Sequence, residues 1–339
     1  MEVMIGQLQE LDADTAAFAR QLGISAVQLN TPSLEDAGGY WRPDAVSALA
    51  RRCASLGLEL IALENVPQGF MSDIKLGGPR RDAQLEAYCE TVRSVGAAGV
   101  AYLGFNFLVT GVWRTTLDAK GRGGAEVSAF DLAAVAGGNA AGGPQGRTVG
   151  DDPAIDEDGL WRNFATFLET VLPVAESAGV RLALHPDDPP VRQIGPTARL
   201  FYDVANLRRA LQLAANSPAF GFDLCLGTVS EMEGGAAAVR DAIESLGPKG
   251  SICYVHFRQV KGTVPSFEEC FLGEGNYSPV EILDLLAANG FDGYLLDDHV
   301  PHVVGDSDWG HRARAHAIGY MQGLLAAHAA AQVVGAGRG

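Results

Sequence analysis

The sequence is poor in basic residues. Among its 339 residues, 25 are Lys or Arg and 41 are Asp or Glu, which gives a formal net charge of −16. A protein that binds nucleic acid or an anionic membrane surface needs clustered positive charge to neutralise phosphates. The charge balance therefore excludes both kinds of partner. A core is still expected, because 47% of the residues are hydrophobic.

Long apolar runs and a regular cysteine framework are also missing. The N-terminal MEVMIGQLQEL has no basic segment followed by an apolar run, so we predict a first strand there and no signal peptide. The longest apolar segment, 98–113, is interrupted by polar residues and glycines and is shorter than the roughly 20 residues of a membrane span. The cysteines are odd in number and irregularly spaced, which indicates reduced thiols and a cytoplasmic protein. They are Cys53, Cys89, Cys225, Cys253 and Cys270.

Short β-branched runs alternate along the chain with longer segments whose apolar residues recur at helical spacing. The predicted strands are 3–7, 26–29, 58–64, 100–105, 180–185, 220–224, 252–258 and 294–298. The predicted helices lie near 14–22, 43–56, 81–97, 160–178, 203–214, 235–246, 279–290 and 312–330. Each predicted strand is followed by a predicted helix.

Glycine stands at several of the predicted joints from helix to strand, as at Gly23, Gly57, Gly99, Gly179 and Gly290. Glycine there accepts the left-handed conformation that ends a helix. Repeated βα units of this kind predict an α/β fold, the (β/α)8 TIM barrel. The alternative is an open doubly wound sheet, but no Gly-x-Gly-x-x-Gly turn follows the first strand.

One segment breaks the repeat. Residues 106–158, after the fourth strand, are far longer than a normal βα connection and rich in glycine. We expect a mobile loop insertion that serves as a lid over the barrel mouth, against the alternative of a disordered insertion without a role. Residues 1–331 would then form one domain, and 332–339 a flexible tail.

Polar residues mark the carboxyl ends of the last four predicted strands, where TIM barrels carry their active sites. Strand 5 ends in His185, strand 6 in Cys225, strand 7 in His256 and strand 8 in Asp298. About one βα repeat separates each of these residues from the next, so the side chains can converge. Two imidazoles, one thiolate and one carboxylate would complete the ligand set of a divalent ion. Zinc, manganese, cobalt and nickel all remain open.

Further polar residues follow strands 3, 4 and 7. Lys75, Arg114 and Arg258 are candidates to hold the negative charge of a bound substrate, and Asn106 is a candidate to hydrogen-bond its hydroxyl groups. The alternative for the three basic residues is ordinary surface pairing with the many carboxylates.

Together these motifs resemble the D-mannonate dehydratases, sugar-acid enzymes on a xylose-isomerase-like barrel. The resemblance runs over nearly the whole chain, and its most specific part combines HPDDPP with VHFR and the Asp298-His299 pair. Looser support comes from ENVP followed by DIKLG, from FNF followed by WRTTL, and from the Cys-containing strand 6.

The resemblance implies dehydration of D-mannonate to 2-keto-3-deoxy-D-gluconate with a divalent metal, usually manganese. It implies that His185, Cys225, His256 and Asp298 are the metal ligands and that His299 is the catalytic histidine. Removing the proton on C2 requires a cation that stabilises the developing negative charge, together with a general base and a general acid. His299, adjacent to a ligand, would fill one of these two roles.

The chain departs from the family pattern at three places, which marks a divergent member. An Arg-Trp-Phe-Gly segment is replaced by Ile5-Gly6-Gln7-Leu8, and an aspartate before the Trp-Arg segment by Gly111-Val112. The catalytic tyrosine expected after the Asp-His pair has no counterpart. Trp309 and His311 stand nearest to its place, and Tyr320 lies too far along the last helix.

Two other functions remain open. One is a metal-dependent sugar isomerase or epimerase on the same barrel, although such enzymes use Glu where this chain has His185 and Asp298. The other is a non-catalytic barrel that senses a sugar acid or a metal. In either case a small molecule is the expected partner, and we expect an oligomer of identical chains because acidic, apolar-rich barrels often associate through their helices.

Overall fold

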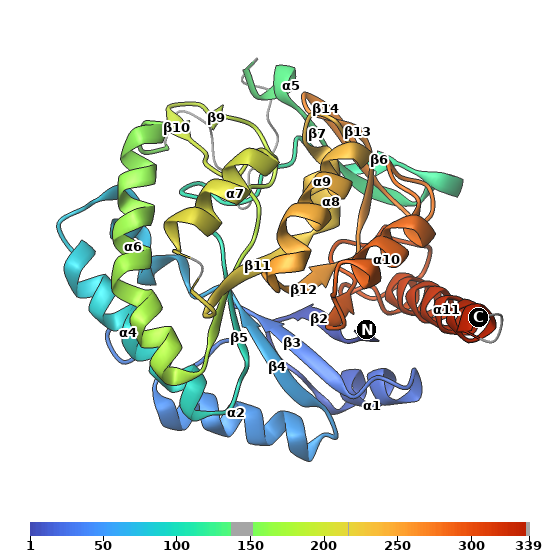
Figure 1. The fold of residues 1–339 in the computed structure, drawn as a ribbon, viewed down its shortest axis with the longest axis horizontal. Coiled ribbons are helices and arrows are strands. Elements are labelled where there is room, and N and C mark those ends of the chain that lie inside the picture. Colours follow the sequence, from blue (N-terminus) through green and yellow to red (C-terminus); the bar gives the residue numbers. More distant parts are fainter. Residues whose placement is uncertain (137–151, 216, 337–339) are drawn as a thin grey trace.

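The computed structural model describes residues 1–136, 152–215 and 217–336. Nine parallel strands form the central sheet (Figure 1). In chain order they are β1 (Glu2–Val3), β2 (Ile5–Leu8), β3 (Ala26–Asn30), β4 (Glu59–Glu64), β5 (Tyr102–Phe105), β8 (Arg181–Leu184), β11 (Phe220–Cys225), β12 (Ile252–His256) and β15 (Tyr294–Leu296). The hydrogen-bonded order is β1-β15-β12-β11-β8-β5-β4-β3-β2, which confirms the predicted barrel.

The predicted first strand is divided in two. β1 pairs with β15 and β2 pairs with β3, so one short stretch of chain closes the ring between the last strand and the second. Met4 joins the two halves, and its backbone N–H donates to Leu295 O at 2.9 Å. The first predicted strand therefore lies where expected, but its two halves pair with different neighbouring strands.

Helices surround the barrel. They are α1 (Ala13–Gln21), α2 (Pro43–Ser55), α3 (Ser72–Leu76), α4 (Arg81–Ala97), α5 (Leu132–Ala136), α6 (Glu157–Ala178), α7 (Val204–Leu213), α8 (Leu226–Glu231), α9 (Ala236–Leu246), α10 (Pro279–Ala288) and α11 (His311–Ala336). All eight predicted helices are present. α6 starts before residue 160 because the Asp156 side chain caps it by accepting from the Gly159 N–H. α11 continues through 332–336, a range expected to be tail, and 337–339 lie outside the described residues.

The inside of the barrel is filled by a large side chain that passes close to a glycine. Tyr254, on β12, is fully buried, and a Cβ at Gly104 would lie only 2.4 Å from its hydroxyl oxygen. Gly104 on β5 therefore makes room for the tyrosine ring. Below the mouth the barrel is thus a packed core rather than a channel, which confines ligands to the strand ends.

A second sheet is built from two segments far apart in the sequence. β6 (Thr116–Lys120) and β7 (Glu126–Asp131) come from the region after β5, and β13 (Gln259–Thr263) and β14 (Ser266–Cys270) follow β12. Their antiparallel order is β13-β14-β7-β6, and they lie together at the upper right of Figure 1. The expectation of a loop over 106–158 was therefore wrong for 116–136, where strands and α5 form. Residues 137–151 lie outside the described part of the chain.

The pairing explains why these strands escaped prediction. The contact between β14 and β7 joins Phe267 to Phe130, whose rings stack with centroids 5.6 Å apart. Each hairpin alone has little apolar surface, and its buried side chains pack in a cluster that also contains Trp113, Val191 and Ile194 from other parts of the chain. None of the helices in the described ranges is both long and apolar enough to cross a membrane.

Candidate active site

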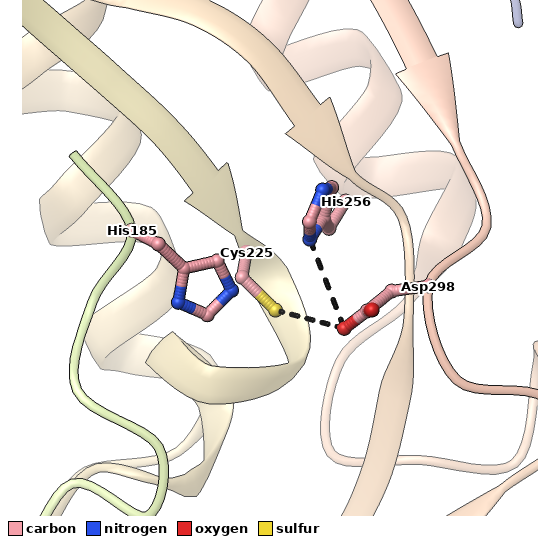
Figure 2. Close-up of side chains that lie close together, drawn as sticks. All are labelled: His185, Cys225, His256 and Asp298. Carbon is pink, nitrogen blue, oxygen red and sulfur yellow. Dashed lines mark hydrogen bonds and ion pairs between the residues drawn. The ribbon is translucent and has the colours of Figure 1, made fainter. Parts of the chain in front are cut away.

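Four side chains converge at the carboxyl ends of β8, β11, β12 and β15. They are His185, Cys225, His256 and Asp298, and Figure 2 shows them gathered around one point. One ligand atom from each lies within 4.8 Å of the others. Bonds of about 2.0–2.3 Å to a single ion allow ligand atoms to lie at most about 4.6 Å apart, so the cluster is close to the size that a metal ion requires.

The distances within the cluster support the same fit. Asp298 Oδ2 lies 3.8 Å from Cys225 Sγ and 3.7 Å from His256 Nδ1. Both ring nitrogens of His256 are buried and make no hydrogen bond of good geometry among the described residues, although carboxylate oxygens lie 3.3 to 3.7 Å from them. Buried polar atoms normally have partners, so Nδ1, which faces the cluster, matches a nitrogen that binds a cation.

The electrostatics of Cys225 also suit a metal ligand. Burial alone would raise the pKa of its thiol, but Arg258 and the imidazoles of His185 and His256 lower that pKa well below its usual value. Burial disfavours the protonated form of His185, and the Cys225 sulfur favours it. The net effect raises the pKa of His185 to about 10. A divalent ion binds the deprotonated forms of these side chains, so its binding would release protons from them.

Two carboxyl groups lie beneath His256. Its Nε2 is 3.3 Å from Asp223 Oδ2 and 3.4 Å from Glu64 Oε2. Burial raises the pKa of Asp223 well above its usual value, and the nearby Glu64 adds to that shift while His256 opposes it. Nε2 therefore faces acceptors and Nδ1 faces Asp298. This arrangement orients Nδ1 toward the cluster, as acidic partners commonly do for metal-binding histidines.

A buried ion network surrounds the cluster on the side of the second sheet. Arg114 forms a two-pronged ion pair with Asp188 and a 2.9 Å contact with Glu269. Arg258 contacts Asp188 at 3.0 Å and Glu231 at 3.0 Å, and it also pairs with Glu269. Burial raises the pKa of Glu269, but Arg258, His299 and Arg114 together lower that pKa to about 2.

His299 is held at the edge of this network. Its Nδ1 lies 2.9 Å from Glu269 Oε1, and its Nε2 lies 3.6 Å from Asp298 Oδ1. The ring is the accessible part of the site, since 39% of the side chain is exposed. It lines a pocket of about 350 Å³ together with Gln7, Arg114 and Asp298.

The predicted substrate-binding residues occupy different places. Arg114 lines the pocket, with its charge already opposed by carboxylates. Arg258 is only 1% exposed and contacts Cys225 Sγ at 3.4 Å, so it acts on the cluster rather than lining the pocket. Lys75 is 5% exposed and donates to Leu108 O and Asn106 Oδ1. Asn106 is part-exposed at the barrel mouth.

The loop after β15 shows what stands near the place of the missing tyrosine. Trp309 lines the pocket, and its Nε1 donates to Gly6 O at 3.3 Å. His311 is turned away from the cluster, with its ring against Phe18 and its Nδ1 bonded to Ser307 Oγ. Neither residue presents a phenol-like donor to the pocket.

Glu269 was not found from the sequence. It lies on β14, a strand that apolar periodicity did not reveal, and only the second sheet brings it to His299. Asp188 lies in the HPDDPP motif, but the sequence pattern did not indicate a role for it. A larger pocket of about 860 Å³, lined by Arg81, Arg162 and Arg192, lies beside α6 and contains none of the cluster residues.

The fold and the site together define a class: a TIM-barrel enzyme with a mixed cluster of imidazole, thiolate and carboxylate able to hold a metal ion. The model of the D-mannonate dehydratase (UxuA) family matches residues 10–143 and 147–334. The chain therefore belongs to the D-mannonate dehydratase family.

Individual relatives agree with this assignment. The chain is 32% identical over 308 residues to mannonate dehydratase 2 of Halalkalibacterium halodurans, which covers 85% of this chain and 88% of the relative. It is 31% identical over 303 residues to mannonate dehydratase of Thermotoga neapolitana, covering 82% and 81%. The crystal structure of mannonate dehydratase from Streptococcus suis serotype 2 superposes with a TM-score of 0.83 at 25% identity, covering 98% and 96%. A structure of L-ribulose 3-epimerase, at 18% identity and a TM-score of 0.59, shares the fold.

Proposed function

We propose that this protein is a hydro-lyase that converts D-mannonate to 2-keto-3-deoxy-D-gluconate and water. The observation that carries the proposal is the meeting of His185, Cys225, His256 and Asp298 in a chain of the D-mannonate dehydratase family. We assign these four side chains as ligands of a divalent metal ion and expect manganese, with zinc, cobalt and nickel as the other candidates. When bound, such an ion stabilises negative charge that develops next to the substrate carboxylate.

The remaining chemistry falls to side chains of the pocket. The reaction removes the proton from C2 and expels the C3 hydroxyl, which leaves as water after it gains a proton. With Nδ1 directed at Glu269, His299 has Nε2 available for proton transfer on the side of Asp298. A general base or acid must lie within hydrogen-bond reach of the reacting group, and His299 is the exposed imidazole next to a proposed ligand.

Arg114 is the proposed contact for the substrate carboxylate. Arg114 lines the pocket from the side of the second sheet, and its guanidinium donates to Asp188, Glu269, Ser128 Oγ and Trp113 O. A substrate carboxylate would take the place of one of these acceptors. A fixed planar guanidinium matches a carboxylate well. Arg258 instead donates to the sulfur of Cys225, and Lys75 donates to the side-chain oxygen of Asn106.

A product assay tests the proposal. The protein loaded with manganese is incubated with D-mannonate, other aldonic acids and uncharged sugars, and the mixtures are analysed for 2-keto-3-deoxy acids and for isomerised sugars. We expect the keto-deoxy product from D-mannonate. Isomerisation or epimerisation of a sugar, without any keto-deoxy acid, would replace the proposal with the isomerase alternative.

A further inference from the structure

The strand ends of the barrel divide into two chemically different halves. The consecutive strands β8, β11, β12 and β15 end in the metal-type side chains of the cluster. Across the barrel, β2, β3, β4 and β5 carry a side-chain amide at or next to their last residue. These amides belong to Gln7, Asn30, Asn65 and Asn106, and we call them the carboxamide arc.

Hydrogen bonds link the arc into a chain that runs in one direction. Asn106 Nδ2 donates to Asn65 Oδ1 at 2.8 Å, and Asn65 Nδ2 donates to Asn30 Oδ1 at 3.4 Å. Asn30 Nδ2 then donates to Gln7 Oε1 at 2.9 Å, and Gln7 Nε2 donates to Glu64 Oε2 at 3.3 Å. The chain therefore ends on the carboxylate that also lies 3.4 Å from His256 Nε2.

The direction of the chain is fixed at its beginning by a group that can only donate. The backbone N–H of Leu108 donates to Asn106 Oδ1 at 3.2 Å, so the oxygen of this amide must face it. Lys75 Nζ donates to the same oxygen at 3.2 Å, even though burial lowers the pKa of Lys75 to about 7. The hydrogen bonds therefore define, for each amide of the arc, which terminal atom is the nitrogen and which is the oxygen.

Part of the hydrogen-bonding capacity of the arc remains open. Among the bonds that the described residues make, Gln7 uses one N–H and one oxygen lone pair, and keeps one of each. Asn106 keeps one N–H, and Asn65 keeps one lone pair on its oxygen. All three side chains are part-exposed, and Gln7 lines the same pocket as Asp298 and His299.

The backbone at two of these positions is unusual. Gln7 has a φ of 58° and Asn65 a φ of 60°, in the left-handed region that few residues other than glycine adopt. Asparagine tolerates this conformation, but glutamine gains nothing locally from it. Such conformations concentrate at ligand sites, where the surrounding structure holds them in place.

We infer that the carboxamide arc binds the hydroxyl groups of a polyhydroxylated substrate chain, opposite the half of the barrel where the cluster and Arg114 receive its carboxyl end. An alcohol both donates and accepts a hydrogen bond, and the arc offers open donors and open acceptors at the ends of β2, β4 and β5. The arc carries no charge of its own, so it selects for hydroxyls without attracting a second carboxylate. The inference rests on the proposed function for the identity of the substrate, but not for the existence of the arc.

Two variants test the arc. Gln7→Met keeps an unbranched side chain and removes the amide, and Asn106→Asp keeps the oxygen that Leu108 and Lys75 require and removes the N–H donors. Binding to the manganese-loaded protein is measured by calorimetry for D-mannonate and for glycolate, a 2-hydroxy acid with no further hydroxyl groups. Asn289→Ala, at the end of α10, is the control.

Each variant is expected to weaken D-mannonate binding by about three- to tenfold, the effect of one lost neutral hydrogen bond, and to leave glycolate binding unchanged. A change of less than about threefold in both variants would overturn the inference. So would equal losses for both ligands, or a wild type that binds no aldonic acid more tightly than glycolate. If D-mannonate binds and both variants weaken it, but no keto-deoxy product forms, the arc stands and the proposed reaction falls.

Discussion

Nδ1 of His299 lies 2.9 Å from Oε1 of Glu269, although the two residues come from different parts of the site. His299 follows the last barrel strand, and Glu269 belongs to β14 of the second sheet. The carboxylate directs the proton of the ring to Nδ1, which leaves Nε2 for the pocket. The second sheet therefore supplies the partner of the proposed catalytic histidine.

Replacing Glu269 with Gln should slow the reaction without removing the metal. The amide keeps the shape of the side chain but loses the charge that orients His299 and pairs with Arg114, so kcat should fall about 10- to 100-fold. Steady-state kinetics and metal analysis measure the two effects. Glu268→Gln, on the more exposed face of the same strand, is the control. A kcat within twofold of wild type for Glu269→Gln would show that the contact has no role in turnover.

The ligand assignment predicts loss of metal from two variants. Cys225→Ser removes the thiolate and His256→Ala removes an imidazole, so each should bind less than one ion per chain after dialysis. Inductively coupled plasma mass spectrometry measures the number of metal ions per chain. Cys89→Ser, a buried thiol on α4, should keep the wild-type metal content. Full metal content in both ligand variants would disprove the assignment.

His299→Ala should separate catalysis from metal binding. The variant keeps the four proposed ligands, so its metal content should equal that of wild type. Turnover of D-mannonate should fall by about 10²- to 10⁴-fold, the usual contribution of a general acid or base. An unchanged rate would remove His299 from the mechanism.

Much of the barrel could be predicted from local sequence alone. Helical periodicity and glycines at the helix ends mark each βα unit, and Gly179 does end α6 in the left-handed conformation. His185 and Asp298 could be placed near each other because parallel strands present their carboxyl ends at one edge. These features depend on contacts within each repeat or between neighbouring repeats.

The second sheet could not be predicted in the same way. β7 and β14 come from distant parts of the chain, and no local pattern indicates that Ala129 pairs with Glu268. The ion network could not be predicted for the same reason, since Arg114 and Glu269 come into contact only when this sheet has formed. Arg114 and Arg258 were expected either to hold substrate or to pair at the surface, and the structure buries both.

A helix cap gives a prediction for stability and its pH dependence. Asp12 caps α1 by accepting from the Thr15 N–H at 2.7 Å, and this backbone hydrogen bond lowers the pKa of Asp12. Asp12→Ala should reduce the free energy of unfolding by about 1 kcal/mol at pH 7. Because the folded-state pKa is depressed, the stabilisation is full above the unfolded pKa of about 3.9 and is lost as the pH falls through the folded value.

Denaturant unfolding of both proteins at neutral pH and near pH 3 measures this difference. The gap between wild type and Asp12→Ala should narrow at the lower pH. Glu10→Ala, an exposed residue just before the helix, should unfold like wild type at both values. A gap that stays constant with pH would mean that the cap does not depend on the carboxylate charge.

The pairing of β14 with β7 has a consequence for how the protein folds. It joins residues near 130 to residues near 267, one of the more distant pairings along the chain, and closing so long a loop is slow. We predict that the barrel strands come together first and that the second sheet, which holds Glu269, is among the last parts to form. In pulse-labelling hydrogen exchange, the amides of β7 and β14 should gain protection after those of β4 and β5. A newly made chain would then acquire its catalytic geometry only in the final stage of folding.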